Sequence, residues 1–338
     1  MNATSRLAIA YGVLAGCSRA QSALHPAGPQ AGRIAALWWL MFWVSAAVFC
    51  AVVVGLAIAA VRGRRRGQAD VTGAPVANGG DEPGKVAVVT VCTAVTVVVI
   101  FVLLVVSVMT DRGLAMLATH DPLTVEVTGH QWWWEVDYDD STPSQRVTTA
   151  NEIHIPVGQP VLFKLTSRDV IHSFWIPNLH GKTDLIPGYV TRTWIQADVP
   201  GTFRGQCAEF CGVQHAHMAL VVVAEPPEKF QAWLAQQRQP AAAPAEPLAQ
   251  RGHDVFVTGP CVLCHAIRGT IAMSRAGPDL THLAARGTLA AGTISNTPGH
   301  LAGWILDPQS AKPGALMPAT SLGSEDLQAL LAYLGMLR

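Results

Sequence analysis

The twelve residues from Cys207 to Met218 carry several side chains that could bind a metal ion. Their order is Cys-Ala-Glu-Phe-Cys-Gly-Val-Gln-His-Ala-His-Met. Thiolate, imidazole and thioether groups are soft or borderline ligands, which suit copper better than magnesium or calcium. Two alternatives stay open, namely a disulfide or a structural zinc site, although neither requires a methionine. The candidate ligands lie four, four and three residues apart, so that one tight loop can turn them inward: Cys207, Cys211, His215 and Met218.

A second reactive cluster lies near the C-terminus, in the stretch Cys-Val-Leu-Cys-His that ends at His265. The pattern Cys-x-x-Cys-His is typical of covalent haem c attachment, with Cys261 and Cys264 bonded to the haem and His265 under the iron. A redox-active pair of the thioredoxin kind is the alternative, but no βαβ pattern surrounds it. Met317 lies in a proline-rich frame and is the expected distal ligand. Met273 is the rival and lacks such a frame.

The first cluster lies in a region of short alternating runs that predict β-strands. Two stretches between these runs are turn signals, Pro-Val-Gly-Gln-Pro from residue 156 and Pro-Gly from residue 200. Many short strands at such spacing predict a β-sandwich or barrel. The expected strands are Thr124–Gly129, Glu152–Ile155, Val161–Leu165, Thr193–Ala197 and Leu220–Val223.

The haem-attachment motif lies in a separate region that is expected to be helical. We expect a short helix over Glu228–Gln237, followed by a stiff Pro/Ala linker that reaches Pro247. A helix over Gln250–Val257 should lead into the attachment site. The amphipathic pattern of Ser324–Leu337 predicts a closing helix with Ser324 as its N-terminal cap.

Two apolar segments precede both clusters, Ile34–Val61 and Val86–Met109, and each can cross a hydrocarbon core of about 30 Å. The arginine-rich run Arg62–Arg66 follows the first, and such runs stay on the cytoplasmic side. We therefore expect a hairpin whose two ends lie outside the cytoplasm. Residues 1–17 are typical of an export signal that ends in a bacterial lipobox, with Cys17 lipidated; the alternative is an uncleaved tail.

The composition agrees with a membrane protein. Half of the 338 residues are hydrophobic, and the formal net charge is zero, which gives no electrostatic case for nucleic-acid binding. The cysteines occur as singles at positions 17, 50 and 92 and as close pairs at 207/211 and 261/264. This arrangement does not indicate a disulfide framework.

These motifs together resemble bacterial cytochrome c oxidase subunit II. The resemblance rests on His172-Ser-Phe and on the pattern Cys-x-Glu-x-Cys-Gly-x-x-His-x-x-Met at residues 207–218, which is that of the binuclear copper site called CuA. It implies that two thiolates bridge the coppers, that each histidine binds one copper, and that a methionine and a backbone carbonyl are weak outer ligands. It also implies a magnesium ion at the Glu209 carboxylate. The implied copper ligands are His172, Cys207, Glu209 (through its carbonyl), Cys211, His215 and Met218.

The stretch Gly-His-Gln-Trp-Trp-Trp from residue 129 also matches this family. The resemblance implies that electrons enter the copper site at Trp132, whereas plain core packing of the three tryptophans is the alternative. The acidic run Glu135–Asp140 that follows resembles part of a docking rim, with a solvated hairpin end as its alternative. A glutamate that the family often places at the start of the second membrane helix has a weak counterpart here in Glu82.

The resemblance covers essentially the whole chain and implies a fold and a function. The expected parts are a transmembrane hairpin (34–110), a cupredoxin-like β-sandwich (120–226), a helix and linker (227–247) and a small all-α cytochrome c domain (248–338). The chain would take electrons through its haem c from cytochrome c or a quinol–cytochrome c reductase complex. It would pass them through CuA to haem in subunit I, which reduces oxygen to water and pumps protons. Subunit III is a further expected partner, and the location is the bacterial inner membrane with both redox domains on the extracytoplasmic face.

Three other classes of protein would share some of these features. The small subunit of a copper-containing nitric oxide reductase would use the same parts. A quinol oxidase subunit II shares the fold, but the family pattern implies that it has lost the copper ligands, which are all present here. A copper-delivery protein would have no use for a covalent haem. The chain itself is expected to hold no oxygen-reducing site.

Overall fold

The computed structural model describes residues 21–67, 83–115 and 122–338. Cys17 and Glu82 therefore lie outside the described residues. The chain divides into two compact units, one formed by residues 33–116 and the other by residues 1–32 and 117–338. Each unit is described by itself below.

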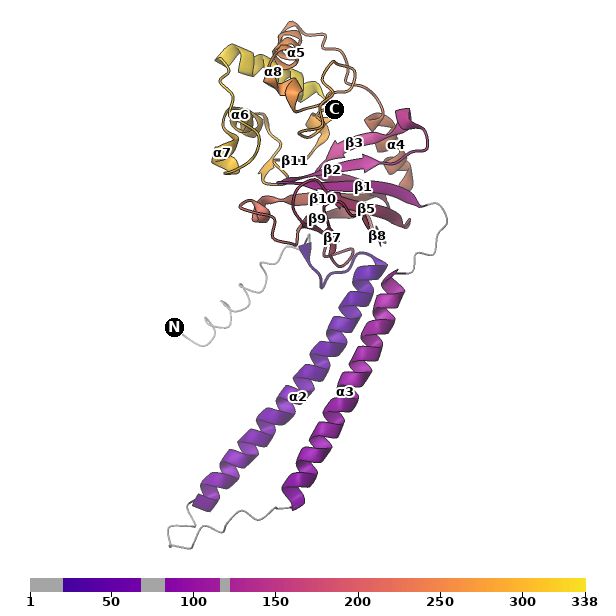
Figure 1. Cartoon of the computed structure of the whole chain (residues 1–338), viewed down its shortest axis with the longest axis vertical. Coiled ribbons are helices and arrows are strands. Elements are labelled where there is room, and N and C mark those ends of the chain that lie inside the picture. The colour runs from indigo at the N-terminus through magenta and orange to yellow at the C-terminus, as the bar shows by residue number, and fades with distance from the viewer. Residues whose placement is uncertain (1–20, 68–82, 116–121) are drawn as a thin grey trace, which may run out of the picture. The chain divides into compact units, whose positions relative to one another are not determined.

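The smaller unit is a pair of long helices, α2 (Pro29–Gly67) and α3 (Pro83–Ala115) (Figure 1). Both are long and apolar enough to cross a membrane, with mean hydropathies of 2.7 and 3.0 over their most apolar windows. Large apolar side chains such as Phe49 and Leu56 are exposed, 69% and 65%, as suits helices that meet lipid or other membrane helices. The two apolar helices that the sequence predicts are confirmed.

The larger unit begins with a β-sandwich of two five-stranded sheets. β1 pairs in parallel with β5, and β10 pairs in parallel with β4, while the other pairings are antiparallel. The first sheet has the order β3 (Val147–Ala150), β2 (Trp133–Tyr138), β1 (Leu123–His130), β5 (Val161–Ser167) and β8 (Thr191–Ile195). The second has the order β4 (Glu152–Pro156), β10 (Ala219–Glu225), β9 (Gly201–Cys207), β6 (His172–Trp175) and β7 (Thr183–Leu185).

Alternation of buried and partly exposed residues explains why these strands form a sandwich. Along β5 every second side chain is buried, including Phe163 and Leu165. These side chains meet those of the facing sheet, such as Ile153 and Leu220, in one apolar core. The predicted cupredoxin-like sandwich is confirmed, and α4 (Pro227–Gln237) packs Phe230 into the same core.

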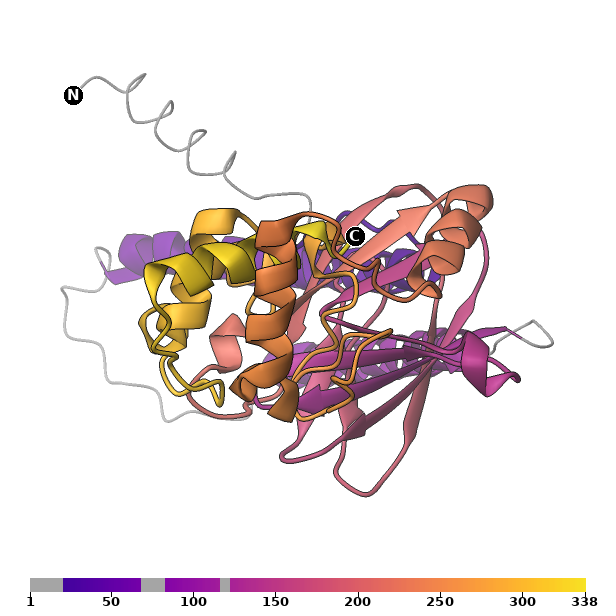
Figure 2. The same ribbon diagram turned by 90° about the horizontal axis from the view of Figure 1, so that it is seen from above.

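The C-terminal part is a small helical domain, seen beside the strands in Figure 2. Phe256 of α5 and Tyr333 of α8 meet in its core. The predicted all-α domain is confirmed, apart from a two-stranded hairpin of β11 (Thr288–Leu289) and β12 (Ile294–Ser295). Its α-helices are α5 (Pro247–Thr258), α6 (Pro298–Leu306), α7 (Pro308–Ala311) and α8 (Ser324–Met336).

The prediction that Ser324 is the N-terminal cap of the last helix is wrong by one position. Gly323 occupies the cap position of α8, with no side-chain hydrogen bond to the helix, and Ser324 is already helical. The acidic side chains of Glu325 and Asp326 lie in the first turn, where the helix dipole favours negative charge. Both also pair with Arg251 of α5, so tertiary contacts hold this end of the helix in place of a serine cap.

Candidate copper and haem sites

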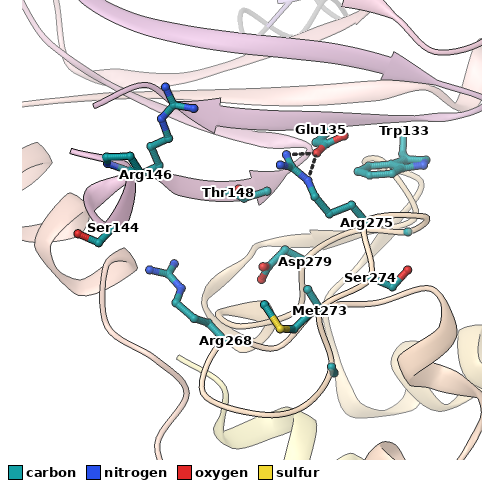
Figure 3. A pocket seen from close by; sticks show the side chains of 14 residues that line it. Trp133, Glu135, Ser144, Arg146, Thr148, Arg268, Met273, Ser274, Arg275 and Asp279 are labelled. Carbon is teal, nitrogen blue, oxygen red and sulfur yellow. Dashed lines mark hydrogen bonds and ion pairs between the residues drawn. The ribbon is translucent and has the colours of Figure 1, made fainter. Parts of the chain in front are cut away.

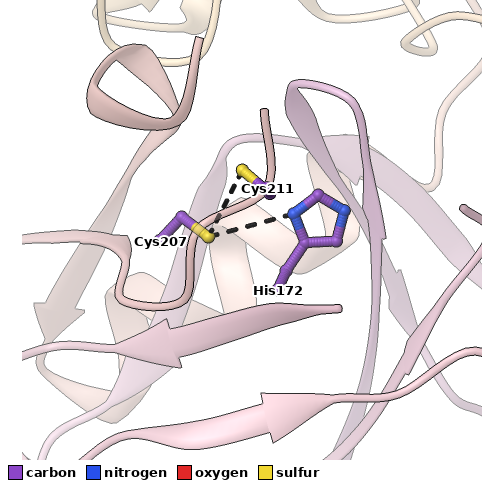
Figure 4. Close-up of side chains that lie close together, drawn as sticks. All are labelled: His172, Cys207 and Cys211. Atoms are coloured by element: carbon purple, nitrogen blue, oxygen red, sulfur yellow. Dashed lines mark hydrogen bonds between the residues drawn. The ribbon is translucent and has the colours of Figure 1, made fainter. Parts of the chain in front are cut away.

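Three of the predicted copper ligands meet where two strands of the second sheet pair. His172 begins β6 and Cys207 ends β9, and the register places Phe174 opposite Cys207. The ligand atoms of His172, Cys207 and Cys211 lie within 4.8 Å of one another, and all three residues are buried (Figure 4). The two cysteines are free thiols with sulfur atoms 3.7 Å apart, so the disulfide alternative does not describe this structure.

The remaining predicted ligands join the same cluster from the loop between β9 and β10. His215 Nδ1 lies 3.6 Å and Met218 Sδ lies 3.9 Å from the Cys211 sulfur. The carbonyl oxygen of Glu209 lies 3.1 Å from the Cys207 sulfur, while the Glu209 side chain is exposed. The fold thus brings together all the copper ligands that the resemblance implied.

Burial and mutual hydrogen bonding make the cysteine pair suited to a metal ion. The hydrogen bond between the two sulfur atoms lowers the pKa of Cys207, and the same contact raises the pKa of Cys211. One proton therefore leaves readily, whereas the second is held because two thiolates would repel each other in a buried place. Metal cations relieve that repulsion, so the donor set fits copper ions.

Asp169 orients the histidine of this cluster and was not predicted from the sequence. Its Oδ1 accepts a hydrogen bond from His172 Nε2 at 2.8 Å, which leaves Nδ1 facing Cys207 at 3.9 Å. Burial would raise the pKa of Asp169, but hydrogen bonds from His172 and from the backbone N–H groups of Val170 and Gln131 lower it overall. Histidines that bind metals commonly donate their other ring N–H to a carboxylate. The presence of Asp169 three residues before His172 could therefore have indicated this role from the sequence.

The three adjacent tryptophans separate into three environments. Trp132 is 9% exposed, and its Nε1 donates to the carbonyl of Cys211 at 2.9 Å. Trp133 is half-buried and stacks on His130, whereas Trp134 is fully buried in the sandwich core. Core packing therefore explains Trp134, but Trp132 lies directly against the copper-ligand loop.

The haem-attachment motif presents one free histidine nitrogen. Cys261 and Cys264 lie on and just after the 3-10 helix η4 (Pro260–Leu263), and both are free thiols. His265 Nδ1 donates to the Pro278 carbonyl at 2.8 Å, so Nε2 is left for a metal. Burial lowers the pKa of His265, which favours the neutral, ligating form. A Cβ at Gly277 would lie 2.8 Å from this ring, so only glycine allows the approach.

A buried arginine gives a further indication that this domain fits a haem group. Arg286 Nε is buried and has no hydrogen-bond partner among the described residues. Haem carries two carboxylate side chains, and a carboxylate would satisfy this donor. Of the two candidate distal ligands, Met273 is 82% exposed, whereas Met317 is half-buried.

Glu135, the first residue of the predicted acidic rim, lines a hollow of about 300 Å³ together with residues of the helical domain such as Arg275 (Figure 3). Glu135 is 5% exposed and accepts hydrogen bonds from the Arg275 guanidinium, which also donates to Asp137 at 2.6 Å. Glu135 is therefore not part of a solvated hairpin end. Burial would raise its pKa, but the hydrogen bond from His130 and the charge of Arg275 together lower it. Arg275 lies 140 residues from Glu135, so the sequence could not reveal their pairing.

Comparison with known proteins gives matches to both parts of the larger unit. The family model described as "Cytochrome C oxidase subunit II, periplasmic domain" matches residues 140–225, and the model "Cytochrome c" matches residues 249–338. "Cytochrome c oxidase subunit 2" of Alkalihalophilus pseudofirmus is 40% identical over 243 residues, which cover 69% of each chain. The protein of the same name from Bacillus subtilis is 32% identical over 224 residues, covering 63% of this chain and 62% of that protein.

One solved structure is also similar to part of this chain. The periplasmic domain of subunit II of cytochrome oxidase from Bradyrhizobium japonicum is 30% identical, with 36% of this chain and 97% of that chain covered. The TM-score of this match is 0.34.

Proposed function

Because this chain belongs to the cytochrome c oxidase subunit II family and carries a cytochrome c domain at its C-terminal end, we propose that it delivers electrons to the catalytic subunit of a haem-copper oxidase. The observation that carries this proposal is the convergence of His172, Cys207 and Cys211 in one buried cluster. Such a soft, preformed ligand set has no evident structural purpose in a sandwich that already has an apolar core.

The copper pair would be held by the thiolates of Cys207 and Cys211 and by the imidazoles of His172 and His215. The sulfur of Met218 and the carbonyl of Glu209 would be weak outer ligands. When bound, such a pair takes up and releases single electrons with little ligand movement. The hydrogen bond from His172 to Asp169 supports this assignment. It holds the histidine ring in place, so that the ligand need not move when the copper changes its oxidation state.

Haem c would be attached through Cys261 and Cys264, and the side chains of His265 and Met317 would bind its iron. The Pro278 carbonyl holds the His265 ring with Nε2 free. A methionine together with a histidine on the haem iron raises the haem potential. We assign Trp132 as the residue through which electrons enter the copper site, because its indole bonds directly to the Cys211 carbonyl.

The remaining parts of the proposal concern assembly in the membrane. Subunit I would receive the electrons, reduce oxygen to water and pump protons, with subunit III as a further partner. Cytochrome c or a quinol–cytochrome c reductase complex would be the donor. The exposed carboxylate of Glu209 would reach a magnesium ion shared with subunit I. The helix pair would span the bacterial inner membrane with the redox domains on the extracytoplasmic face, and Cys17 would be the lipidated residue after removal of the signal.

Cys211→Ser tests the copper assignment in the assembled oxidase. We expect it to abolish the near-infrared absorption of mixed-valence copper and to leave the haem c bands unchanged, because a serine hydroxyl is a far poorer ligand for copper than a thiolate. The matched control is Cys50→Ser, which makes the same change on the membrane helix α2 and should keep both signals. Survival of the near-infrared band in Cys211→Ser would contradict the proposed copper site.

A further inference from the structure

Resting on this proposed function, we propose that Lys312 is a positioning residue that clamps the haem domain onto the copper site. It begins the loop of residues 312–318 that bears Met317, here called the haem-methionine loop, and it reaches the loop of residues 207–218, here called the copper-ligand loop. The clamp would fix the path along which one electron leaves the haem iron, which is oxidised, and reaches the copper pair, which is reduced.

The Lys312 ammonium group is enclosed by backbone carbonyl groups. The residue is 3% exposed, and its Nζ donates to the carbonyl oxygens of Trp132 at 2.7 Å, His217 at 2.8 Å and Ala290 at 3.0 Å. An ammonium group has three N–H donors and no acceptor, so three carbonyls satisfy it completely. Burying a cation is costly unless all its hydrogen bonds are made, and this complete set indicates a built contact.

The three acceptors come from three different segments of the chain. Trp132 lies in the turn between β1 and β2, and His217 lies within the copper-ligand loop between two predicted ligands. Ala290 belongs to the β11–β12 hairpin of the helical domain itself. One cation therefore joins the haem-methionine loop to the copper-ligand loop and to the residue proposed to receive electrons.

Neighbouring contacts join the same two domains. Gln214 Nε2 of the copper-ligand loop donates to the Pro313 carbonyl at 2.6 Å. The Ala219 N–H, one residue beyond that loop, donates to the Ala291 carbonyl at 3.0 Å. Lys312 thus lies within a continuous contact between the domains.

Trp132 lies between the two loops. A Cβ added at Gly314 would be 3.9 Å from the Trp132 ring, so the backbone of the haem-methionine loop runs against the indole. The indole N–H bonds to the Cys211 carbonyl on the side of the copper-ligand loop. Loss of the Lys312 contacts would move the haem-methionine loop away from Trp132 and the copper-ligand loop. Electron transfer from haem to copper would then be slower, because its rate falls with distance.

Lys312→Met in the full-length chain, assembled in the oxidase, tests the clamp. This change keeps a long side chain and removes every donor. We expect copper and haem spectra and midpoint potentials like those of the wild type, but transfer from haem c to copper after rapid photoreduction about 10- to 100-fold slower, since small misplacements have effects of this size. Hydrogen exchange at the Ala219 amide should be faster, because its acceptor Ala291 lies on the other domain.

Lys229→Met is the matched control, since Lys229 is exposed on α4, and it should change neither measurement. If Lys312→Met fails to load copper, Lys312→Gln, which keeps two N–H donors, should show the same two changes in smaller degree. Wild-type transfer together with a protected Ala219 amide would overturn the clamp. Slower electron transfer with an unchanged exchange rate at the Ala219 amide would also overturn the clamp, because Lys312 would then act through its charge alone.

A failure of the proposed function would be seen separately. It would show as a wild-type complex without the near-infrared copper band. In that case the exchange rate of the Ala219 amide would still decide whether Lys312 joins the domains.

Discussion

Two of the three proposed metal-binding histidines, His172 and His265, have one ring nitrogen already engaged by a neighbour outside the metal site. At His172 the Asp169 carboxylate accepts from Nε2, whereas at His265 the Pro278 carbonyl accepts from Nδ1. The engaged nitrogen fixes the tautomer and the direction in which the other nitrogen points. Both rings are therefore oriented by the protein itself, which suits centres that must pass electrons without moving their ligands.

Met317→Ala should lower the haem c midpoint potential or convert the haem to a high-spin form, because a histidine–methionine pair raises the potential. Met273→Ala is the matched control and should change neither property, since Met273 is 82% exposed. Potentiometric titration of the haem bands and their low-temperature spectra make the measurement. An effect of Met273→Ala on the potential, with none from Met317→Ala, would reverse the ligand assignment.

The candidate ligands could be proposed from the sequence because each lies in a short motif, and Asp169 lies only three residues before His172, whereas the contacts of Lys312 could not be predicted. Cys207 and Cys211 are four residues apart, and Cys261 and His265 are likewise close. Lys312 contacts Trp132 across 180 residues. No local spacing encodes such a contact, which exists only after two domains have folded and met.

At the scale of elements, strand pairing decides the geometry of the copper site. β6 and β9 are neighbours in one sheet, and their register places His172 near Cys207. The alternation of apolar residues predicted β1, β4, β5, β8 and β10. The short strands β3 and β7 lack a clear alternating pattern, so their pairing depends on the sheet as a whole.

The contacts of Arg275 with Glu135 and Asp137 stabilise the docked domains, and we expect their contribution to the free energy of unfolding to depend on pH. Glu135 has a lowered pKa in the folded chain, so its contribution is present above its unfolded value of 4.5 and is lost as the pH falls through the folded value. Arg275→Gln should destabilise the chain at pH 7 by about 1–2 kcal/mol, less than the roughly 3–5 kcal/mol of a fully buried pair, because Arg275 is 56% exposed.

The difference between wild type and Arg275→Gln should shrink below pH 4.5 as Glu135 takes up a proton. Asp137 also contacts Arg275, and burial raises its pKa against the hydrogen bond from Thr148 and the charge of Arg275. Its share of the difference should therefore be lost as the pH falls through a folded value above 3.8. Thermal unfolding of both proteins at several pH values makes the measurement. A difference that stays constant down to pH 3 would contradict the role given to Glu135.

At the scale of the whole molecule, each part could be predicted because its signal is local. A long apolar run, an alternating run and a Cys-x-x-Cys-His motif each identify one part of the chain without reference to the others. The docking of the helical domain on the sandwich has no such signal. It depends on single residues, such as Arg275 and Lys312, whose partners lie on another domain.

Charge on either side of the two apolar helices predicts how the chain lies in the membrane. Five basic residues lie at the ends of the helices that the segment of residues 68–82 connects, namely Arg62, Arg64, Arg65, Arg66 and Lys85, against Arg33 and Arg112 at the other ends. Basic residues near membrane helices are retained in the cytoplasm. These ends should therefore be cytoplasmic, and the sandwich and helical domain should both lie outside.

Fusions of alkaline phosphatase test this orientation, because that enzyme needs disulfides, which form outside the cytoplasm. A fusion after residue 67 should be inactive, and one after Arg338 should be active. β-Galactosidase, which works only inside, should give the opposite pattern at the same two positions. Phosphatase activity of the fusion after residue 67 would place the arginine-rich end of α2 outside the cytoplasm. The copper cluster would then lie inside it. Both cysteines of Cys-x-x-Cys-His would then also lie on the cytoplasmic side, and an external donor could not reach a haem attached to them.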